Sequence, residues 1–495
     1  NPSIAVSRSD SSTIYVSSNG DDGFHGVFKS TNRLGAMTWS ATGLTPTTGG
    51  AMGTQNGHDG AMGVSPTSSK LVIASAVKPW ISSDGGASWN LPEQLSATNN
   101  GRYHADVHIV AFFGSSIIIG TDGGISVSPD SGKTWDTTND TIPIMNEEGF
   151  SVSGDSILAA SWDTGIHWST DHGDHWAGTY ENNVSEDTST TFISSSTKWF
   201  EDPATGTNDL MTSSNQGVSW ATSPVAPVTV NTKMVGLLGK TYATGGPGTG
   251  GPQTQWNGIW VVDDGNGGNS AYAASQKQFT SVPTTMTAFT IGGGHVVVIA
   301  GAFYNGGSPT QDLMLSQDGG PWKEIGQPAL PTDIVAIRRD SDTNPIIYVL
   351  TSSGRVFADY SNDVLHSITI GRIPSWLEFT GNLPSNLGYA DIIADHAQST
   401  AYVATNLGVF ASTNSCLMTG GLCLPTVWQR WSDGLPLAPA QVNTTFPGAT
   451  SAQRGDPGTA VMAFDAQTRS DGRFYIYAAT WNRGIWVRDA TSGEP

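Results

Sequence analysis

Short apolar runs alternate with polar turns along the whole chain. Runs such as 14–16, 71–74 and 117–120 are rich in Val, Ile, Tyr and Ala, and Gly, Ser, Thr and Asn fill the segments between them. Within these runs the apolar residues recur with a period of two, which places successive side chains on opposite faces of an extended segment. The pattern therefore predicts β-strands, grouped into small sheets that are joined by tight turns.

One turn sequence recurs along the chain. Ser82–Trp89 reads SSDGGASW, which has the form Ser-x-Asp-x-Gly-x-Thr/Ser-Trp. The Asp or Asn accepts hydrogen bonds from the amides of its own turn, the Gly takes a positive φ, and the Trp buries a large ring beside the next strand. We interpret the motif as a structural hairpin turn and not as a catalytic element. Further copies are found at Ser128–Trp135, Ser169–Trp176, Ser213–Trp220 and, one residue shorter, Ser316–Trp322.

The recurring turn resembles the Asp-box (BNR) repeat of β-propellers. Families with this repeat include sialidases, xyloglucan-active glycoside hydrolases and sortilin-type receptors. The resemblance implies an all-β propeller of repeated four-stranded blades. A sialidase needs a triad of Arg residues, a Tyr/Glu pair and an Asp, and this chain offers no such set, so we discount that activity.

The spacing of the motif's Trp residues gives the length of the repeat. From Trp39 to Trp220 the steps are 50, 46, 41 and 44 residues, and Trp322, Trp376 and Trp431 follow after 102, 54 and 55. A four-stranded blade needs roughly 40–50 residues, so the 495 residues hold about ten repeats. We expect residues 1–495 to form a single domain with one ring of ten blades, because a split into seven and three leaves three blades with open edges. The alternative is a ring of seven or eight blades with insertions.

Composition favours an extracellular protein. The net charge of −20 opposes binding to nucleic acid or to an anionic membrane. The two Cys residues, Cys416 and Cys423, predict one local disulfide. Glycosylation sequons begin at Asn139, Asn183 and Asn443. We expect a secreted, monomeric, mature chain whose leader has been removed.

The densest set of chemically active side chains lies in the segment 101–108. In an extended segment His104, Asp106 and His108 alternate onto one face. They suit a general base with its orienting carboxylate, a sugar-binding edge or a metal site, although three close ligands are few for a metal. Arg102 and Tyr103 precede them. A structural polar network near the ring axis explains the same residues.

Other candidates lie in the loops that lead into inner strands or join second and third strands. Asp122, in the sequence Thr-Asp-Gly-Gly, is similar to a catalytic carboxylate of the xyloglucan-active hydrolases, and Asp163 occupies the same place one repeat later. A turn-capping role explains both equally well. The remaining candidates for substrate binding are His58, Asp59, Glu148, Trp162 and Trp481.

These residues support three functions. The first is a glycoside hydrolase in which Asp122 and Asp163 act on a polysaccharide, backed by Asp59, Asp106 and Glu148. The second is a polysaccharide lyase in which a His abstracts a proton, Tyr103 acts as the acid and Arg102 holds a uronate. The third is a non-catalytic propeller of the sortilin type that binds a glycan or peptide. The sequence predicts a polysaccharide or oligosaccharide partner and neither a cofactor nor a metal.

Overall fold

The structure is a computed structural model, and the chain is built almost entirely of β-strands. Ten small antiparallel sheets are found among the described residues, in agreement with the repeats that the sequence predicts. The one helix described, α1 (Ser361–Thr369), is too short to cross a membrane. The structure describes residues 3–491 except 21–22, 33–36, 46–59, 76, 93–105, 138–145, 163–164, 180–187, 196–197, 204–208, 228–232, 246–257, 264–269, 272–282, 306–307, 312, 327–329, 332, 399, 413–425, 433–434, 436–459 and 481–483.

The chain forms two compact units, Asn1–Ile144 and Met145–Pro495. The first unit has three sheets, in each of which strands pair in sequence order. Its first sheet holds β1 (Ser3–Val6), β2 (Ile14–Gly20), β3 (Gly23–Ser30) and β4 (Ser40–Ala41). The second holds β5 (Ala61–Val64), β6 (Val72–Ser75) and β7 (Pro79–Ser82). The third holds β8 (Val107–Phe113), β9 (Ser116–Thr121), β10 (Gly124–Ser128) and β11 (Asp136–Thr137).

The second unit has seven sheets that follow the same order. The first three hold β12 (Asn146–Ser153), β13 (Ser156–Trp162), β14 (Gly165–Ser169) and β15 (Ala177–Thr179); β16 (Thr188–Ser195), β17 (Lys198–Pro203), β18 (Asp209–Ser213) and β19 (Ala221–Pro227); and β20 (Met234–Leu237), β21 (Lys240–Gly245), β22 (Gly258–Asp263) and β23 (Ser270–Ala271). The fourth and fifth hold β24 (Pro283–Ile291), β25 (His295–Asn305), β26 (Ser308–Gln311), β27 (Met314–Gln317) and β28 (Lys323–Glu324); and β29 (Ile334–Arg339), β30 (Ile346–Thr351), β31 (Val356–Tyr360) and β32 (Leu377–Glu378). The last two hold β33 (Tyr389–Asp395), β34 (Thr400–Thr405), β35 (Gly408–Ser412) and β36 (Trp428–Arg430); and β37 (Val461–Thr468), β38 (Phe474–Thr480) and β39 (Gly484–Asp489).

The repeated turn has the hydrogen bonds that its sequence predicts. After β7, the N–H of Gly86 donates to Ser82 Oγ (2.8 Å), and the N–H of Ser88 donates to Asp84 Oδ1 (2.9 Å). Gly86 has a φ of 91°, which an L side chain rarely adopts. The motif therefore stabilises hairpins in both units. The same two bonds recur from Gly132 and Thr134, from Gly173 and His175, and from Gly217 and Ser219.

Neighbouring sheets of the first unit pack closely because of a glycine. A Cβ on Gly63 of β5 would lie 2.6 Å from Val110 Cγ1 and 2.9 Å from Phe112 Cε2, both on β8. The outward side chains of the first and third sheets are less well covered. Ile4 of β1 and Phe113 of β8 are exposed by 65% and 81%. The middle sheet thus packs against the other two through two separate apolar clusters, while the end sheets keep apolar residues on their open faces.

A recurring hydrogen bond links the inner strands of neighbouring sheets in the second unit. In each case a side-chain oxygen on one inner strand accepts the backbone N–H of the adjacent inner strand. The donor residues and acceptor atoms are Ile193 and Ser151 Oγ (3.1 Å), Ile337 and Thr285 Oγ1 (3.0 Å), Phe464 and Asp391 Oδ2 (2.9 Å), and Val152 and Asp465 Oδ2 (2.6 Å). The last of these inner-strand hydrogen bonds joins β37 to β12, the final sheet of the unit to its first.

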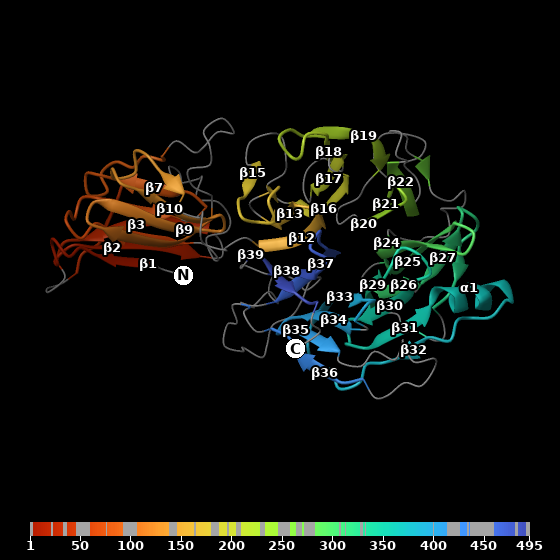
Figure 1. The fold of residues 1–495 in the computed structure, drawn as a ribbon. Helices are drawn as coiled ribbons and strands as arrows, with labels where there is room; N and C mark the ends of the chain where they lie inside the picture. Colours follow the sequence, from red (N-terminus) through yellow and green to blue (C-terminus); the bar gives the residue numbers. More distant parts are fainter. Residues whose placement is uncertain are drawn as a thin grey trace. The chain divides into compact units, whose positions relative to one another are not determined.

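The seven sheets of the second unit therefore close into a ring of their own. Phe150 and Ile157 of the first sheet form one apolar cluster with Tyr477 and Ala479 of the last. Figure 1 shows the sheets following one another around a common centre. Because β12 packs between β16 and β37, its sheet has no free face for a further blade. The expected ring of ten blades is thus corrected. The repeat lengths of the two units overlap, so spacing alone does not reveal where a ring closes.

Candidate functional site

A β-bulge at the start of β8 presents His108. Val107 pairs with Thr121 and Ile109 pairs with Gly120, so His108 is the extra residue of the bulge. A bulge of this kind turns a side chain away from the regular alternation of its strand. A Cβ on Gly120 would lie 2.5 Å from Ile109 Cγ2, so glycine is needed opposite the bulge.

His108 is hydrogen-bonded to Asp122 in the turn between β9 and β10. The distance between His108 Nε2 and Asp122 Oδ1 is 2.6 Å. The two side chains are 34% and 32% exposed, so both touch solvent as well as protein. A carboxylate that accepts Nε2–H holds the imidazole in the tautomer whose Nδ1 carries the lone pair. This is the geometry of an oriented general base.

Asp106 lies immediately before this strand in a left-handed backbone conformation. Its φ is 60°, which is uncommon for a residue other than glycine, although Asp tolerates it better than most. Its N–H donates to the carbonyl of Val77, in the connection between β6 and β7 (2.9 Å). The segment that leads into β8 is thereby fixed to the neighbouring sheet.

The expected alternation of Asp106 and His108 onto one face is not what the structure shows, and His104 lies outside the described residues. Asp106 precedes the strand, and His108 lies in the bulge, so the period of two is interrupted between them. The structure instead joins His108 to Asp122, two candidates that the sequence placed in separate loops. Asp122 is therefore not a lone carboxylate. The sequence gives no signal for the bulge, because a bulge depends on the pairing register.

The same bulge recurs at the start of other inner strands, and two of the extra residues are ionisable, His108 and Glu148. The sequence placed Glu148 in a loop before the inner strand, whereas it belongs to β12. The bulge is therefore a recurring backbone feature at one end of the inner strands. The extra residues are His108, Glu148, Ser189, Val335, Ala390 and Met462.

Most other candidates lie outside the described residues. Trp162 is the last residue of β13, opposite Asn146, and the structure describes its backbone alone. Asp163 lies outside the described residues, so the expected carboxylate pair of Asp122 and Asp163 stays a prediction. Among the described residues, no group of His, Cys, Asp and Glu side chains forms a candidate metal site. Outside the described residues are His58, Asp59, Arg102, Tyr103, His104, Asp163 and Trp481, together with Cys416, Cys423, Asn139, Asn183 and Asn443.

A charged cluster on the inner strands of the second unit was not singled out from the sequence. Arg338 of β29 donates through Nε and Nη2 to the two carboxylate oxygens of Asp391 on β33. Burial raises the pKa of Asp465 on β37 to about 6, although N–H groups and Arg338 oppose this shift. The cluster carries two of the inner-strand hydrogen bonds, so we interpret it as part of ring closure.

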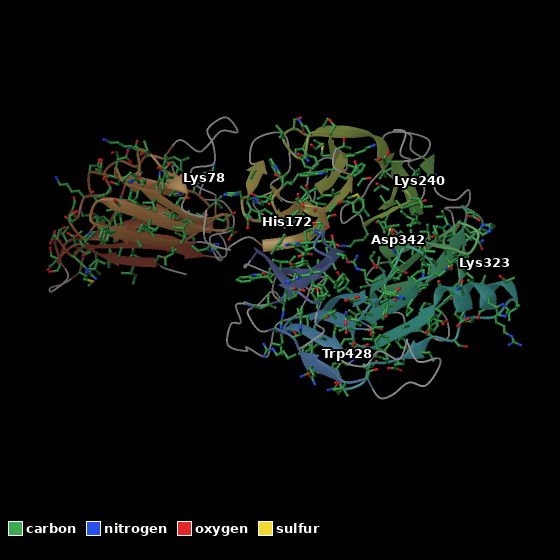
Figure 2. All side chains as sticks on the ribbon, viewed as in Figure 1. Lys78, His172, Lys240, Lys323, Asp342 and Trp428 are labelled. Carbon is green, nitrogen blue, oxygen red and sulfur yellow. The ribbon has the colours of Figure 1, made fainter. Side chains whose placement is uncertain are left out.

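A second arginine lies next to this cluster. Arg339 donates to Asp342, which is labelled in Figure 2, and to the carbonyl of Gly236 on β20. Burial is the largest influence on Arg339 and lowers its pKa, against the attraction of Asp342. Arg339 therefore ties the fifth sheet of the ring to the third, as a structural contact.

Comparison with solved structures supports the propeller fold. PorZ of Porphyromonas gingivalis, a surface component of the type-IX secretion system, is similar with a TM-score of 0.53 at 12% identity, over 99% of this chain and 68% of that one. The extracellular domain of BT4673 from B. thetaiotaomicron has a TM-score of 0.45 at 10% identity, over 99% and 58% of the two chains. The GH74 xyloglucanase of Xanthomonas campestris has a TM-score of 0.24 at 12% identity, over 99% and 85%.

Sequence comparisons add no family. No family model matches the chain, and no curated protein matches it either. At 12% identity the likeness to PorZ concerns the fold and not the activity. The chain is thus a β-propeller-like protein built from ten small antiparallel sheets.

Proposed function

We propose that the protein is a secreted enzyme that cleaves a polysaccharide, with His108 as the proton acceptor and Asp122 as the carboxylate that orients it. The observation that carries the proposal is the 2.6 Å hydrogen bond between these side chains at a partly exposed end of the third sheet. A partly exposed His held by a carboxylate matches the needs of general base catalysis. A purely structural polar network does not require that a carboxylate orient His108.

The reaction that best suits an oriented base is elimination at a uronate. His108 would take the proton from the carbon beside the uronate carboxylate. The electron pair then forms a carbon–carbon double bond, and the glycosidic C–O bond on the next carbon breaks. The leaving oxygen takes a proton, for which Tyr103 is the expected donor, and Arg102 is the expected partner of the carboxylate.

The charge distribution permits an anionic substrate at the first unit. Residues 1–144 hold 7 Lys and Arg against 11 Asp and Glu, a net charge of −4 out of the −20 of the whole chain. The field that repels anions is therefore concentrated in the second unit. A few local Arg residues are sufficient to hold a carboxylate in the first unit.

A glycoside hydrolase is the second candidate, and the position of Asp122 favours it. The carboxylate is partly exposed in a turn, where it can reach a sugar bond. Hydrolysis needs a second carboxylate across that bond. Asp163 and Glu148 are the expected partners, and their side chains lie outside the described residues.

The test is a panel of uronate-containing and neutral polysaccharides with wild type, His108→Ala and Asp122→Asn. Elimination gives new ends together with the ultraviolet absorbance of an unsaturated uronate, whereas hydrolysis gives reducing ends without it. We expect the absorbance with wild type and its loss in both variants. His396→Ala is the matched control, because His396 also binds an Asp at 2.7 Å, Asp340, in the second unit. If wild type leaves every polysaccharide intact, both enzyme proposals are wrong and a binding propeller is favoured.

A further inference from the structure

The first sheet of the first unit has an apolar face that is exposed to solvent. Ile4 and Val6 of β1 are 65% and 42% exposed. Ile4 pairs with Val16 and Val6 pairs with Ile14 of β2, so these four apolar side chains lie on one face of the sheet. Tyr15, on the other face of β2, is buried in the cluster shared with the second sheet. The first sheet is therefore apolar on both faces.

The third sheet has a second exposed face of this kind. Beyond its bulge, β8 places Ile109, Ala111 and Phe113 on one side, and Ile109 and Phe113 are 59% and 81% exposed. Ile118 of β9 pairs with Ala111 and extends this apolar face. Phe112, on the opposite side of β8, packs in the cluster shared with the second sheet. Contiguous exposed apolar faces mark sites of protein–protein interaction.

The middle sheet shows how faces of this kind are covered. Met62 of β5 packs in the cluster of the first sheet, and Ile73 of β6, opposite Gly63, packs in the cluster of the third. Each sheet thus turns one face to its predecessor and the other to its successor. The first sheet exposes the face that meets a predecessor, and the third sheet exposes the face that meets a successor. The two exposed faces are therefore the two halves of an interface that the unit already forms twice.

The sheets of the second unit are already used in their own ring. Each of its seven sheets packs against two others of that unit, and β12 closes the ring against β37. The cover for the first unit therefore comes from other sheets. A second copy of the chain supplies both halves of the interface, because its third sheet fits the first sheet of its partner and its first sheet fits the third.

We propose that two copies of the chain join head to tail, with the first sheet of each packed on the third sheet of the other. Head-to-tail contacts form a closed ring when their rotation closes. Propellers typically have about 4–8 blades, which the six sheets of two copies satisfy and the nine of three copies do not. The first unit carries −4 of the chain's net charge of −20, so repulsion between two first units is small. This proposal replaces the monomer expected from the sequence and is independent of the reaction proposed for His108.

The experiment measures the mass of the full chain by sedimentation equilibrium over a range of protein concentrations. We expect wild type at twice the mass of one chain. Ile4→Lys and Phe113→Asp each place a charge in both interfaces of the ring, so each variant alone should dimerise at least about a hundredfold more weakly. Val218→Asp is the matched control, because Val218 is also 65% exposed but lies in a turn of the second unit, and it should dimerise like wild type.

Mixing the two charged variants tests the head-to-tail pairing. One interface of the mixed dimer is then wild type, and the other brings the introduced lysine and the introduced aspartate together. We expect mixing to restore dimerisation to within about tenfold of wild type, because opposite charges share that interface. If circular dichroism shows that either variant is unfolded, Val6→Lys and Ile109→Asp repeat the test on the same two faces.

Four results would overturn the proposal. They are a monomer at every concentration, a dimer that neither charged variant weakens, a dimer that only one of them weakens, and variants that do not rescue each other on mixing. The third of these results would indicate a contact between two equal faces. A mass of three chains would contradict closure by two copies.

Discussion

Replacing Asp465 by Asn is expected to stabilise the ring at neutral pH. Asp465 accepts the N–H of Val152 across the seam between the last and first sheets, and burial raises its pKa from 3.8 to about 6. The folded protein therefore holds a proton on this carboxyl that the unfolded chain loses near its ordinary pKa. The protonated Asp465 carboxyl therefore makes its full contribution to the free energy of unfolding below pH 3.8. That contribution is lost as the pH rises to about 6.

The magnitude follows from the size of this window. A difference of about two pKa units corresponds to about 3 kcal/mol in the free energy of unfolding. Asn has no charge to desolvate, and its Oδ1 still accepts the N–H of Val152. Asp465→Asn should therefore be up to about 3 kcal/mol more stable than wild type at pH 8, and similar to it at pH 4.

The assay is urea unfolding between pH 4 and pH 8. Calorimetry at the same pH values is used to distinguish the unfolding transitions of the two units. Asp391→Asn is the matched control on the neighbouring inner strand. Its carboxylate binds Arg338 through two hydrogen bonds, so its loss should destabilise the ring by about 3–5 kcal/mol. If Asp465→Asn is less stable than wild type at pH 8, the reasoning about the buried carboxyl is wrong.

Three further predictions concern the first unit. Asp122→Asn should lower the turnover of the proposed reaction by about 10²–10⁴-fold and leave thermal unfolding unchanged, because it misorients His108 without removing core contacts; an unchanged turnover would remove Asp122 from the site. Gly63→Val should cost about 1–3 kcal/mol in urea unfolding, since its Cβ would overlap Val110, and an unaffected midpoint would show that the sheets can separate freely. Asp130→Ala should lower the melting temperature at pH 7 and have no effect near pH 1. The reason is that backbone N–H groups, that of Thr134 first, lower the pKa of Asp130 to about 2, and the hydrogen bonds of its carboxylate are lost as pH falls through that value. An equal effect at both pH values would contradict this.

The sheets and their turns follow from local sequence. The bonds in the turn of Ser82 and Asp84 involve residues within six positions of each other, so the motif specifies them without reference to the rest of the fold. The period of two specifies the strands in the same way. These local features account for the agreement between the repeats and the observed sheets.

Ring closure depends on contacts that no local pattern contains. Val152 and Asp465 are separated by 313 residues, and Asp465 has no motif around it that distinguishes it from a surface acid. The bulge at His108 depends on the register of β8 against β9, which a single strand does not encode. The pairing of His108 with Asp122 was missed for that reason, although both residues had been chosen as candidates.

The closing seam also sets the order in which the ring can be completed during synthesis. A ribosome adds roughly 5–20 residues per second, so the 313 residues between Val152 and Asp465 take roughly 15–60 s to appear. Throughout that time Phe150 and its neighbours lack the sheet that covers them in the finished protein. The nascent ring is therefore most prone to aggregate at its first sheet, and a chaperone that shields this one surface would protect the whole unit.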